Sequence, residues 1–199
     1  MSQEHESVDL VGDATVRHIA LASVLAALTA AFAYVSIPLP GLPAPISFQV
    51  FGVFFAGLLL GPRWGAFSMV LYVLVGVAGA PVFSNGGAGL AYLLGPTGGY
   101  IVSWVVAAVV IGLLVHRGLD PRPLSSVSLG VQAGALVAGV AVIYAIGVSW
   151  LAVSAGYDFV HAATVGAAIF LPGDLIKIAA TLGLVRAGVL AREQAGHTA

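Results

Sequence analysis

Six apolar runs, each bounded by turn-forming residues, occupy most of the sequence. They cover residues 17–36, 47–60, 64–80, 98–116, 126–151 and 161–186. A helix rises 1.5 Å per residue, so runs of this kind are suited to crossing about 30 Å of hydrocarbon. Only 8% of the 199 residues are charged, whereas soluble domains average about 25%. We therefore predict an all-α integral membrane protein of the cell membrane with six transmembrane helices in the lipid bilayer.

The second and third runs are short, and only residues 61–64 separate them. Two consecutive membrane-spanning helices are one interpretation of this pattern. A re-entrant hairpin, which enters and leaves the membrane on the same side, is the competing interpretation.

The arginines give an independent test of the helix count, because positively charged residues gather on the cytoplasmic side of a membrane protein. Of the five connections between the predicted helices, the first, third and fifth would lie on the side opposite the cytoplasm. They contain no Lys or Arg and cover residues 36–46, 81–97 and 151–160. The other connections and the two chain ends hold every arginine: Arg17, Arg63, Arg117, Arg122, Arg186 and Arg192. This alternation predicts six spans with the N- and C-termini both cytoplasmic.

The two ends of the chain are polar. Residues 1–16 carry four acidic and no basic residues, the reverse of the positively charged start of a signal peptide. We therefore expect an acidic N-terminal tail over residues 1–16, a transmembrane domain over residues 17–190 and a polar C-terminal tail over residues 191–199.

A short polar interruption at residues 171–177 stands out in the last apolar run. Asp174 and Lys177 are three residues apart, so they share one helix face within salt-bridge reach. Phe170 and Thr181 fall on the same face, and Pro172 can kink the helix to open a cavity. Ionisable residues inside a membrane usually mark a ligand or transport site. We interpret the pair as a ligand site; a buried ion pair that only fixes helix packing is the alternative.

Two outer connections have unusual composition. Residues 36–45 include four prolines, which makes the backbone stiff and extended; the segment is either a lid over a cavity or a rigid connector. Residues 81–100 are rich in glycine, which permits close approach to a ligand or tight turns. Gln49, at the start of the second run, and Asn85 carry amides that can both donate and accept hydrogen bonds.

Alanines form a stripe along the first predicted helix, with Ala22, Ala26, Ala30 and Ala33 spaced by four, four and three residues. Small residues at this spacing allow close helix contact. The partner is either another helix of this chain or a separate membrane protein.

Several enzymatic chemistries lack their residues. Lys177 is the only lysine and no phosphate-binding glycine-rich loop precedes it, so the chain has no ATPase motif. Neither HExxH nor Gly-x-Ser-x-Gly occurs, and there is no cysteine. We predict a protein that is not an enzyme, with no metal, cofactor or nucleic-acid partner.

The motifs together resemble the BioY family, the biotin-binding S components of energy-coupling-factor (ECF) transporters. The resemblance spans roughly residues 17 to 190 and is carried by these blocks: Pro45-Ile-Ser-Phe-Gln49, Ala56-Gly-Leu-Leu-Leu-Gly-Pro-Arg-Trp-Gly65, Leu71-Tyr72, Gly79-Ala-Pro-Val-Phe83, Leu94-Gly-Pro-Thr-Gly-Gly-Tyr100 and Gly173-Asp-Leu-Ile-Lys177. It implies a biotin pocket in the outward half of a six-helix bundle. Energy would come from a separate transmembrane coupling subunit and two ATPase subunits.

The resemblance also implies which residues contact biotin: Asp174, Lys177, Gln49, Asn85, Tyr92 and Phe170. Asp174 would accept hydrogen bonds from the ureido N–H groups, while Lys177 would neutralise the valerate carboxylate or support Asp174. Many relatives have Gly-Gly-x-Gly-Gly where this chain has Asn85-Gly-Gly-Ala-Gly89. The alanine stripe of Ala22, Ala26 and Ala30 matches the surface by which such subunits dock on the coupling subunit.

Two other functions compete with biotin capture. One is an S component for another vitamin, such as thiamine or riboflavin, on the same helical scaffold. The other is a membrane-embedded enzyme that uses Asp174 as a general base.

Overall fold

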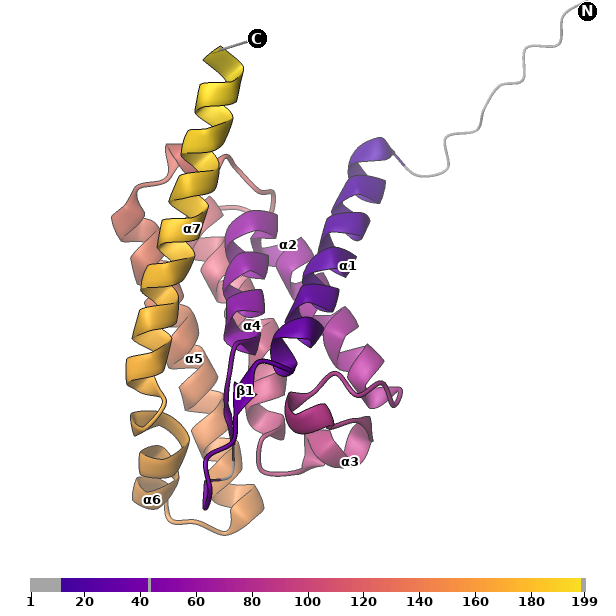
Figure 1. Ribbon diagram of the computed structural model, residues 1–199, viewed down its shortest axis with the longest axis vertical. Coiled ribbons are helices and arrows are strands. Elements are labelled where there is room, and N and C mark those ends of the chain that lie inside the picture. The colour runs from indigo at the N-terminus through magenta and orange to yellow at the C-terminus, as the bar shows by residue number, and fades with distance from the viewer. Residues whose placement is uncertain (1–11, 43, 198–199) are drawn as a thin grey trace, which may run out of the picture.

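A computed structural model of the chain describes residues 12–42 and 44–197, and these residues are mostly helical. Seven α-helices run in the order α1 (Asp13–Ala33), α2 (Gln49–Val77), α3 (Gly89–Leu94), α4 (Gly98–His116), α5 (Leu129–Ala155), α6 (Phe159–Ala163) and α7 (Leu171–His197). The long helices lie side by side as a bundle (Figure 1). Five segments among the described residues are long and apolar enough to cross a membrane: α1, α2, α4, α5 and the stretch Phe159–Gly188.

The ends of the bundle differ in detail from the predicted boundaries. α1 begins at Asp13, so the last residues of the predicted N-terminal tail are helical, and residues 1–11 lie outside the described part. α7 extends to His197, because no proline follows Arg186 and the alanine, leucine, arginine, glutamate and glutamine residues there favour a helix. Most of the predicted C-terminal tail therefore continues the last helix.

α2 folds back on itself at Gly61 and Pro62. Gly61 has a φ of 72°, which favours glycine, and Pro62 cannot continue the hydrogen bonding of the preceding turn. Gln49 Nε2 lies 2.5 Å from the hydroxyl of Tyr72, although the two residues are 23 positions apart. A straight helix would separate them by about 34 Å. The two halves of α2 are therefore antiparallel arms of a helical hairpin.

The tip of this hairpin lies at the same end of the bundle as the start of α1 and the α4–α5 connection. The His18 ring stacks on Trp64, with centroids 5.2 Å apart. A Cβ added at Gly61 would lie 3.4 Å from the His116 ring and 3.5 Å from the backbone of Pro121. Figure 1 shows the start of α1, the α4–α5 connection and the end of α7 together at this end. We name it the arginine end, because Arg17, Arg63, Arg117 and Arg122 flank these contacts.

A buried histidine fastens the hairpin to α4 at the arginine end. His116 Nε2 lies 3.0 Å from the carbonyl oxygen of Leu58, and its Nδ1 accepts a 3.0 Å hydrogen bond from the backbone N–H of Arg122. The Arg122 guanidinium donates two bonds, of 2.9 and 2.6 Å, to the carbonyl of Val115. The bonds from Arg122 satisfy the Val115 carbonyl, which the end of α4 leaves without a helical partner.

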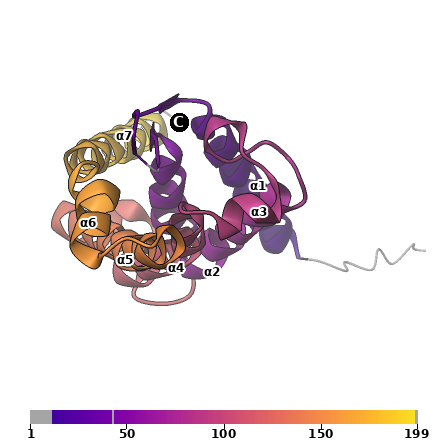
Figure 2. The same cartoon turned by 90° about the horizontal axis from the view of Figure 1, so that it is seen from below.

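Short elements close the opposite end. β1 (Ser36–Ile37) and β2 (Ile46–Ser47) form an antiparallel pair in which Ser36 faces Ser47. A 3₁₀ turn (Ser84–Gly86) precedes α3, and a π-helical turn (Thr164–Ala168) lies between α6 and α7. Seen from this end, the β1–β2 pair, α3 and α6 lie around the rim of the bundle (Figure 2).

The alanine stripe of α1 packs inside the chain. Ala22 is fully buried, Ala26 is 6% exposed and Ala30 is partly buried, all in the hydrophobic cluster that α1 shares with α2 and α4. Ser68 of α2 donates a 2.8 Å hydrogen bond to the Ala22 carbonyl. The alanine stripe therefore contacts other helices of this chain. The prediction that Ala22 and Ala26 form a docking surface is wrong, because neighbouring helices already cover them.

Close backbone contact at the hairpin tip generates a stability prediction. A Cβ at Gly112 would lie 2.4 Å from the Pro62 nitrogen and 2.6 Å from the Gly61 carbonyl carbon, which are backbone atoms that cannot rotate away. We expect Gly112→Ala to lower the free energy of unfolding by about 1–3 kcal/mol, the usual cost of overpacking. The measurement is thermal unfolding of the detergent-solubilised protein.

Gly134→Ala is the matched control, because a Cβ at Gly134 has nothing within 4 Å. Alanine favours a helix interior over glycine, so this variant should melt at or slightly above the wild-type temperature. Equal melting temperatures for the two variants would contradict the close contact between α4 and the hairpin tip.

Candidate functional site

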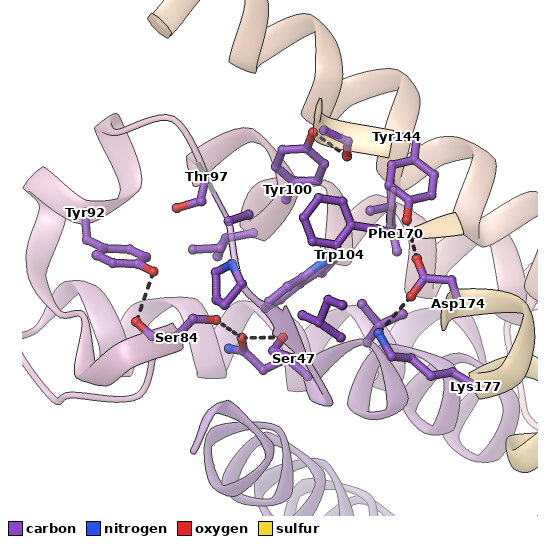
Figure 3. Close-up of a pocket in the computed structure, with 18 residues that line it drawn as sticks. Ser47, Ser84, Tyr92, Thr97, Tyr100, Trp104, Tyr144, Phe170, Asp174 and Lys177 are labelled. Atoms are coloured by element: carbon purple, nitrogen blue, oxygen red, sulfur yellow. Dashed lines mark hydrogen bonds and ion pairs between the residues drawn. The ribbon is translucent and has the colours of Figure 1, made fainter. Parts of the chain in front are cut away.

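A cavity of about 640 Å³ opens at the end of the bundle opposite the arginine end. This volume includes the open mouth of the cavity, and a mostly apolar lining with a few polar groups is typical of small-molecule sites. Figure 3 shows polar groups at its two sides and aromatic side chains between them. The lining residues come from the 44–50 segment, the α2–α4 connection, α4, α5 and the α6–α7 region: Ala44, Pro45, Ile46, Ser47, Gln49, Val50, Ser84, Tyr92, Thr97, Tyr100, Ile101, Trp104, Ile143, Tyr144, Gly166, Phe170, Asp174 and Lys177.

One side of the cavity carries the predicted ion pair. Lys177 Nζ lies 2.8 Å from Asp174 Oδ1, and the two residues are 8% and 4% exposed. The hydroxyl of Tyr144, from α5, donates a 2.5 Å hydrogen bond to Asp174 Oδ2. Each carboxylate oxygen keeps one acceptor position, and the ammonium keeps two N–H groups. The charges of Asp174 and Lys177 cancel, so the cluster is neutral overall. Its free positions can still bind donors and acceptors of a ligand.

Tyr144 was missing from the sequence-based set of site residues. It stands alone in the apolar run 126–151, with no polar neighbour at helical spacing to mark it. Only the packing of α5 beside α7 brings its hydroxyl to Asp174.

The chain before α7 is irregular and forms part of the cavity wall. Gly166, in the π-helical turn, accepts a 2.9 Å hydrogen bond from the hydroxyl of Tyr100. Such turns leave carbonyls free to bond outside the helix and are frequent at functional sites. The irregularity precedes Pro172, which lies in the first turn of α7, where a missing N–H costs no hydrogen bond. The helix is thus interrupted earlier than the predicted Pro172 kink.

Gln49 lines the other side, but its amide is mostly engaged within the protein. Its Oε1 accepts hydrogen bonds from the hydroxyls of Ser47 and Ser84, and its Nε2 donates to Tyr72. Tyr72 in turn donates to the carbonyl of Val82 at 2.9 Å. Gln49 therefore joins the segment after β1, the α2 hairpin and the turn before α3. The serine hydroxyls beside it are the groups that line the cavity with acceptor capacity to spare.

Tyr92 lines the cavity, whereas Asn85 does not. The Tyr92 hydroxyl donates a 3.1 Å hydrogen bond to the Ser84 carbonyl, and its ring stacks on Phe83 at 5.2 Å. Burial raises the pKa of Tyr92 above its ordinary value, so the hydroxyl stays protonated. Asn85 is exposed, with a φ of 58°, and serves the turn. Its neighbour Ser84 lies at the cavity in its place.

Apolar side chains fill the wall between the polar sides. They are Val50, Ile101, Trp104, Ile143 and Phe170, with the ring of Tyr100 beside them. Tyr100 and Tyr144 meet edge to face, with centroids 6.5 Å apart. The cavity suits a small molecule with hydrogen-bonding groups at both ends and an apolar middle.

Comparison with known proteins agrees with this arrangement. A family model described as the BioY family matches residues 2–194. The chain belongs to the BioY family. The biotin transporter BioY of Rhizobium etli is 37% identical over 173 residues, which cover 85% of this chain and 92% of the relative. The probable biotin transporter BioY of Pyrococcus horikoshii is 37% identical over 163 residues, with 82% and 90% covered.

Solved structures give the same answer for the fold. The chain is similar to the S-component for biotin from an ECF-type ABC transporter, with a TM-score of 0.78 and 27% identity over 89% of this chain and 93% of that one. A second S component of a bacterial ECF transporter shares the fold at a TM-score of 0.53 and 13% identity. This BioY family member is thus a multi-pass protein of the cell membrane and a transport component rather than an enzyme.

The contribution of the ion pair to folding can be tested separately from ligand binding. Lys177→Met would leave the Asp174 carboxylate buried without its cation, which we expect to lower the free energy of unfolding by up to about 3–5 kcal/mol. The double variant Asp174→Asn/Lys177→Met removes both charges and should recover most of this loss. Thermal unfolding in detergent without ligand measures both. A single variant as stable as wild type would show that the pair contributes little to folding.

Proposed function

We propose that this chain is the substrate-capture S component of an ECF-type transporter and that it binds biotin for uptake into the cell. The observation that carries the proposal is the buried Asp174–Lys177 pair facing a cavity instead of being packed on all sides. Charges in a membrane bundle usually serve a ligand when they face open space. The biotin transporters among the relatives supply the identity of that ligand.

The geometry divides the roles of Asp174 and Lys177. Lys177 is held 2.8 Å from Asp174, so we infer that it supports Asp174 rather than neutralising the valerate carboxylate. The ureido ring of biotin offers two N–H donors and one carbonyl. The free acceptor positions of Asp174 suit the donors, and the remaining N–H groups of Lys177 suit the carbonyl.

The valerate carboxylate would then lie at the opposite side of the cavity. A second carboxylate beside Asp174 would be repelled in this buried setting. The Thr97 hydroxyl lines the far side and can donate to a carboxylate oxygen. The hydroxyls of Ser47 and Ser84 already donate to Gln49 Oε1, so they can donate to the ligand only by giving up those bonds. The apolar wall between suits the thioether ring and the alkyl chain. Gln49, Tyr92 and Phe170 contribute as lining residues, with Gln49 chiefly positioning the two serines.

We infer that residues 36–47 act as a lid. Ala44, Pro45, Ile46 and Ser47 all line the cavity, which favours a lid over a plain connector. The pairing of β1 with β2 spans two residues on each strand, and Ser47 adds a 3.0 Å hydrogen bond to Gln49. So few bonds can be broken and remade at low cost when a ligand enters.

We propose six membrane spans, with the α2 hairpin counted as two and both termini cytoplasmic. The hairpin tip lies level with the α4–α5 connection, which favours two full crossings over a re-entrant loop. The arginine end would face the cytoplasm by the positive-inside rule, and the cavity would open outward. The transmembrane domain would cover residues 17–190, flanked by the polar segments 1–16 and 191–199.

Energy for uptake would come from a separate transmembrane coupling subunit and two ATPase subunits, because the chain resembles an ECF-type S component and its sequence carries no ATPase motif. Docking through α1 would use the residues that the bundle leaves exposed, such as Val24, Ala27 and Ala31, because Ala22 and Ala26 are covered.

Biotin binding by the purified chain tests the proposal. We expect wild type to bind biotin and release it unchanged, and Asp174→Asn to weaken binding by at least about tenfold, since a buried charged acceptor is lost. Asp158→Asn is the matched control, because Asp158 is exposed and caps α6 through the His161 N–H at 3.0 Å. Isothermal titration in detergent gives the dissociation constants. Failure of wild type to bind biotin, or chemical alteration of the ligand, would refute the proposed function.

Single cysteines can test the topology, since the sequence contains none. We expect Ser154→Cys, near the end of α5 on the cavity side, to react with a membrane-impermeant maleimide in intact cells. Arg63→Cys, at the hairpin tip, should react only after permeabilisation. Labelling of Arg63→Cys from outside would contradict the proposed orientation, and no labelling from either side would favour a re-entrant hairpin.

A further inference from the structure

The indole N–H of Trp104 has no hydrogen-bond partner among the residues that the structure describes. Trp104 lies on α4, is 5% exposed and lines the cavity. A buried donor without a partner costs free energy, and native proteins contain few of them. Figure 3 shows Trp104 between the Asp174–Lys177 pair and the Ser47–Ser84 side. This unpaired donor therefore lies where a ligand would pass.

The surroundings fix the indole but do not satisfy it. Its ring packs against Tyr72, with centroids 5.8 Å apart. The Tyr72 hydroxyl is already engaged, since it accepts from Gln49 and donates to Val82. Ile101 and Ile143, which line the cavity beside Trp104, offer no side-chain acceptor. The packing thus holds the donor in place without giving it a partner, as preorganised binding groups require.

Two other side chains show by comparison what is special about Trp104. Thr181 Oγ1 also lacks a partner in the described part of the chain, but Thr181 is not among the cavity-lining residues. Trp150 Nε1 donates a 2.9 Å hydrogen bond to the Gly95 carbonyl, also away from the cavity lining. Trp104 combines an unpaired donor with a place on the cavity wall.

We infer that Trp104 Nε1–H donates a hydrogen bond to the ureido carbonyl oxygen of the bound ligand, and so determines specificity for a cyclic urea. The inference rests on the proposed function. A carbonyl oxygen is a strong acceptor with two lone pairs, so it can accept from Trp104 and Lys177 together, whereas a thioether sulfur is a weak acceptor. The carboxylate belongs at the hydroxyl side, away from Asp174.

Trp104→Phe tests the inference, because it removes the N–H and keeps an aromatic ring. We expect the dissociation constant for biotin to rise about 5- to 100-fold, since the ligand carbonyl loses a buried partner. The ligand-free variant should lose little thermal stability, because the substitution also removes an unsatisfied donor. Trp150→Phe is the matched control and should bind biotin like wild type. Unchanged affinity in Trp104→Phe would overturn the inference, while loss of wild-type binding would refute the proposed function itself.

Ligand analogues identify the acceptor atom. The fold loss of affinity caused by Trp104→Phe should be the same for three ligands: biotin, desthiobiotin, which lacks the sulfur, and biotin methyl ester, which lacks the charged carboxylate. A loss that disappears with desthiobiotin would assign the N–H to sulfur, and one that disappears with the ester would assign it to the carboxylate. Either result overturns the assignment to the ureido carbonyl.

A measurement on wild type does not depend on how the variant folds. The chain has three tryptophans, so ¹⁵N-indole labelling gives three N–H resonances, assigned with Trp64→Phe and Trp150→Phe. Saturating biotin should move the Trp104 resonance downfield, as a new hydrogen bond does, and leave Trp150 in place. A Trp104 resonance that biotin does not move would overturn the inference.

Discussion

The buried ion pair between Lys177 and Asp174 is the interaction on which the site depends. Two charges removed from water are stable only when each finds its partner and further hydrogen bonds. Lys177 supplies the first partner from the same helix, and Tyr144 supplies the second from α5. This arrangement fixes α5 beside α7 and leaves a neutral cluster with unused donor and acceptor positions. A ligand can therefore complete the cluster without having to balance a net charge.

The second organising feature is the hydrogen-bonded amide of Gln49. It joins Ser47 at the end of β2, Ser84 before α3 and Tyr72 on the returning arm of α2. These segments are distant in sequence and together form the side of the cavity opposite the ion pair. One amide can do this because it has both donor and acceptor atoms. The β1–β2 segment, the helical hairpin and the loop before α3 are thus linked through a single buried side chain.

Small residues hold the scaffold that carries both features. Within a membrane, helices gain little from the hydrophobic effect, so close backbone contact must provide the packing. Gly112 meets the hairpin tip, Gly52 meets Thr29 of α1, and Ala22 lies under Ser68. The most extensive helix contacts join α2 to α4, α4 to α5 and α1 to α2, whereas α7 has much smaller contacts with α5 and α2. The helix that carries the charged pair is therefore also among the less tightly packed.

The sequence alone determined the membrane class, the arginine-free and arginine-rich sides, the BioY resemblance and the Asp174–Lys177 pair, because hydropathy, charge position and helical spacing are local patterns. Only the tertiary structure decided that the alanine stripe packs internally, that Gln49 is engaged, that Ser84 rather than Asn85 lines the cavity, and that Tyr144 and Trp104 line it too. These facts depend on contacts between residues far apart in the chain. Such contacts follow from how helices pack, which no local pattern records.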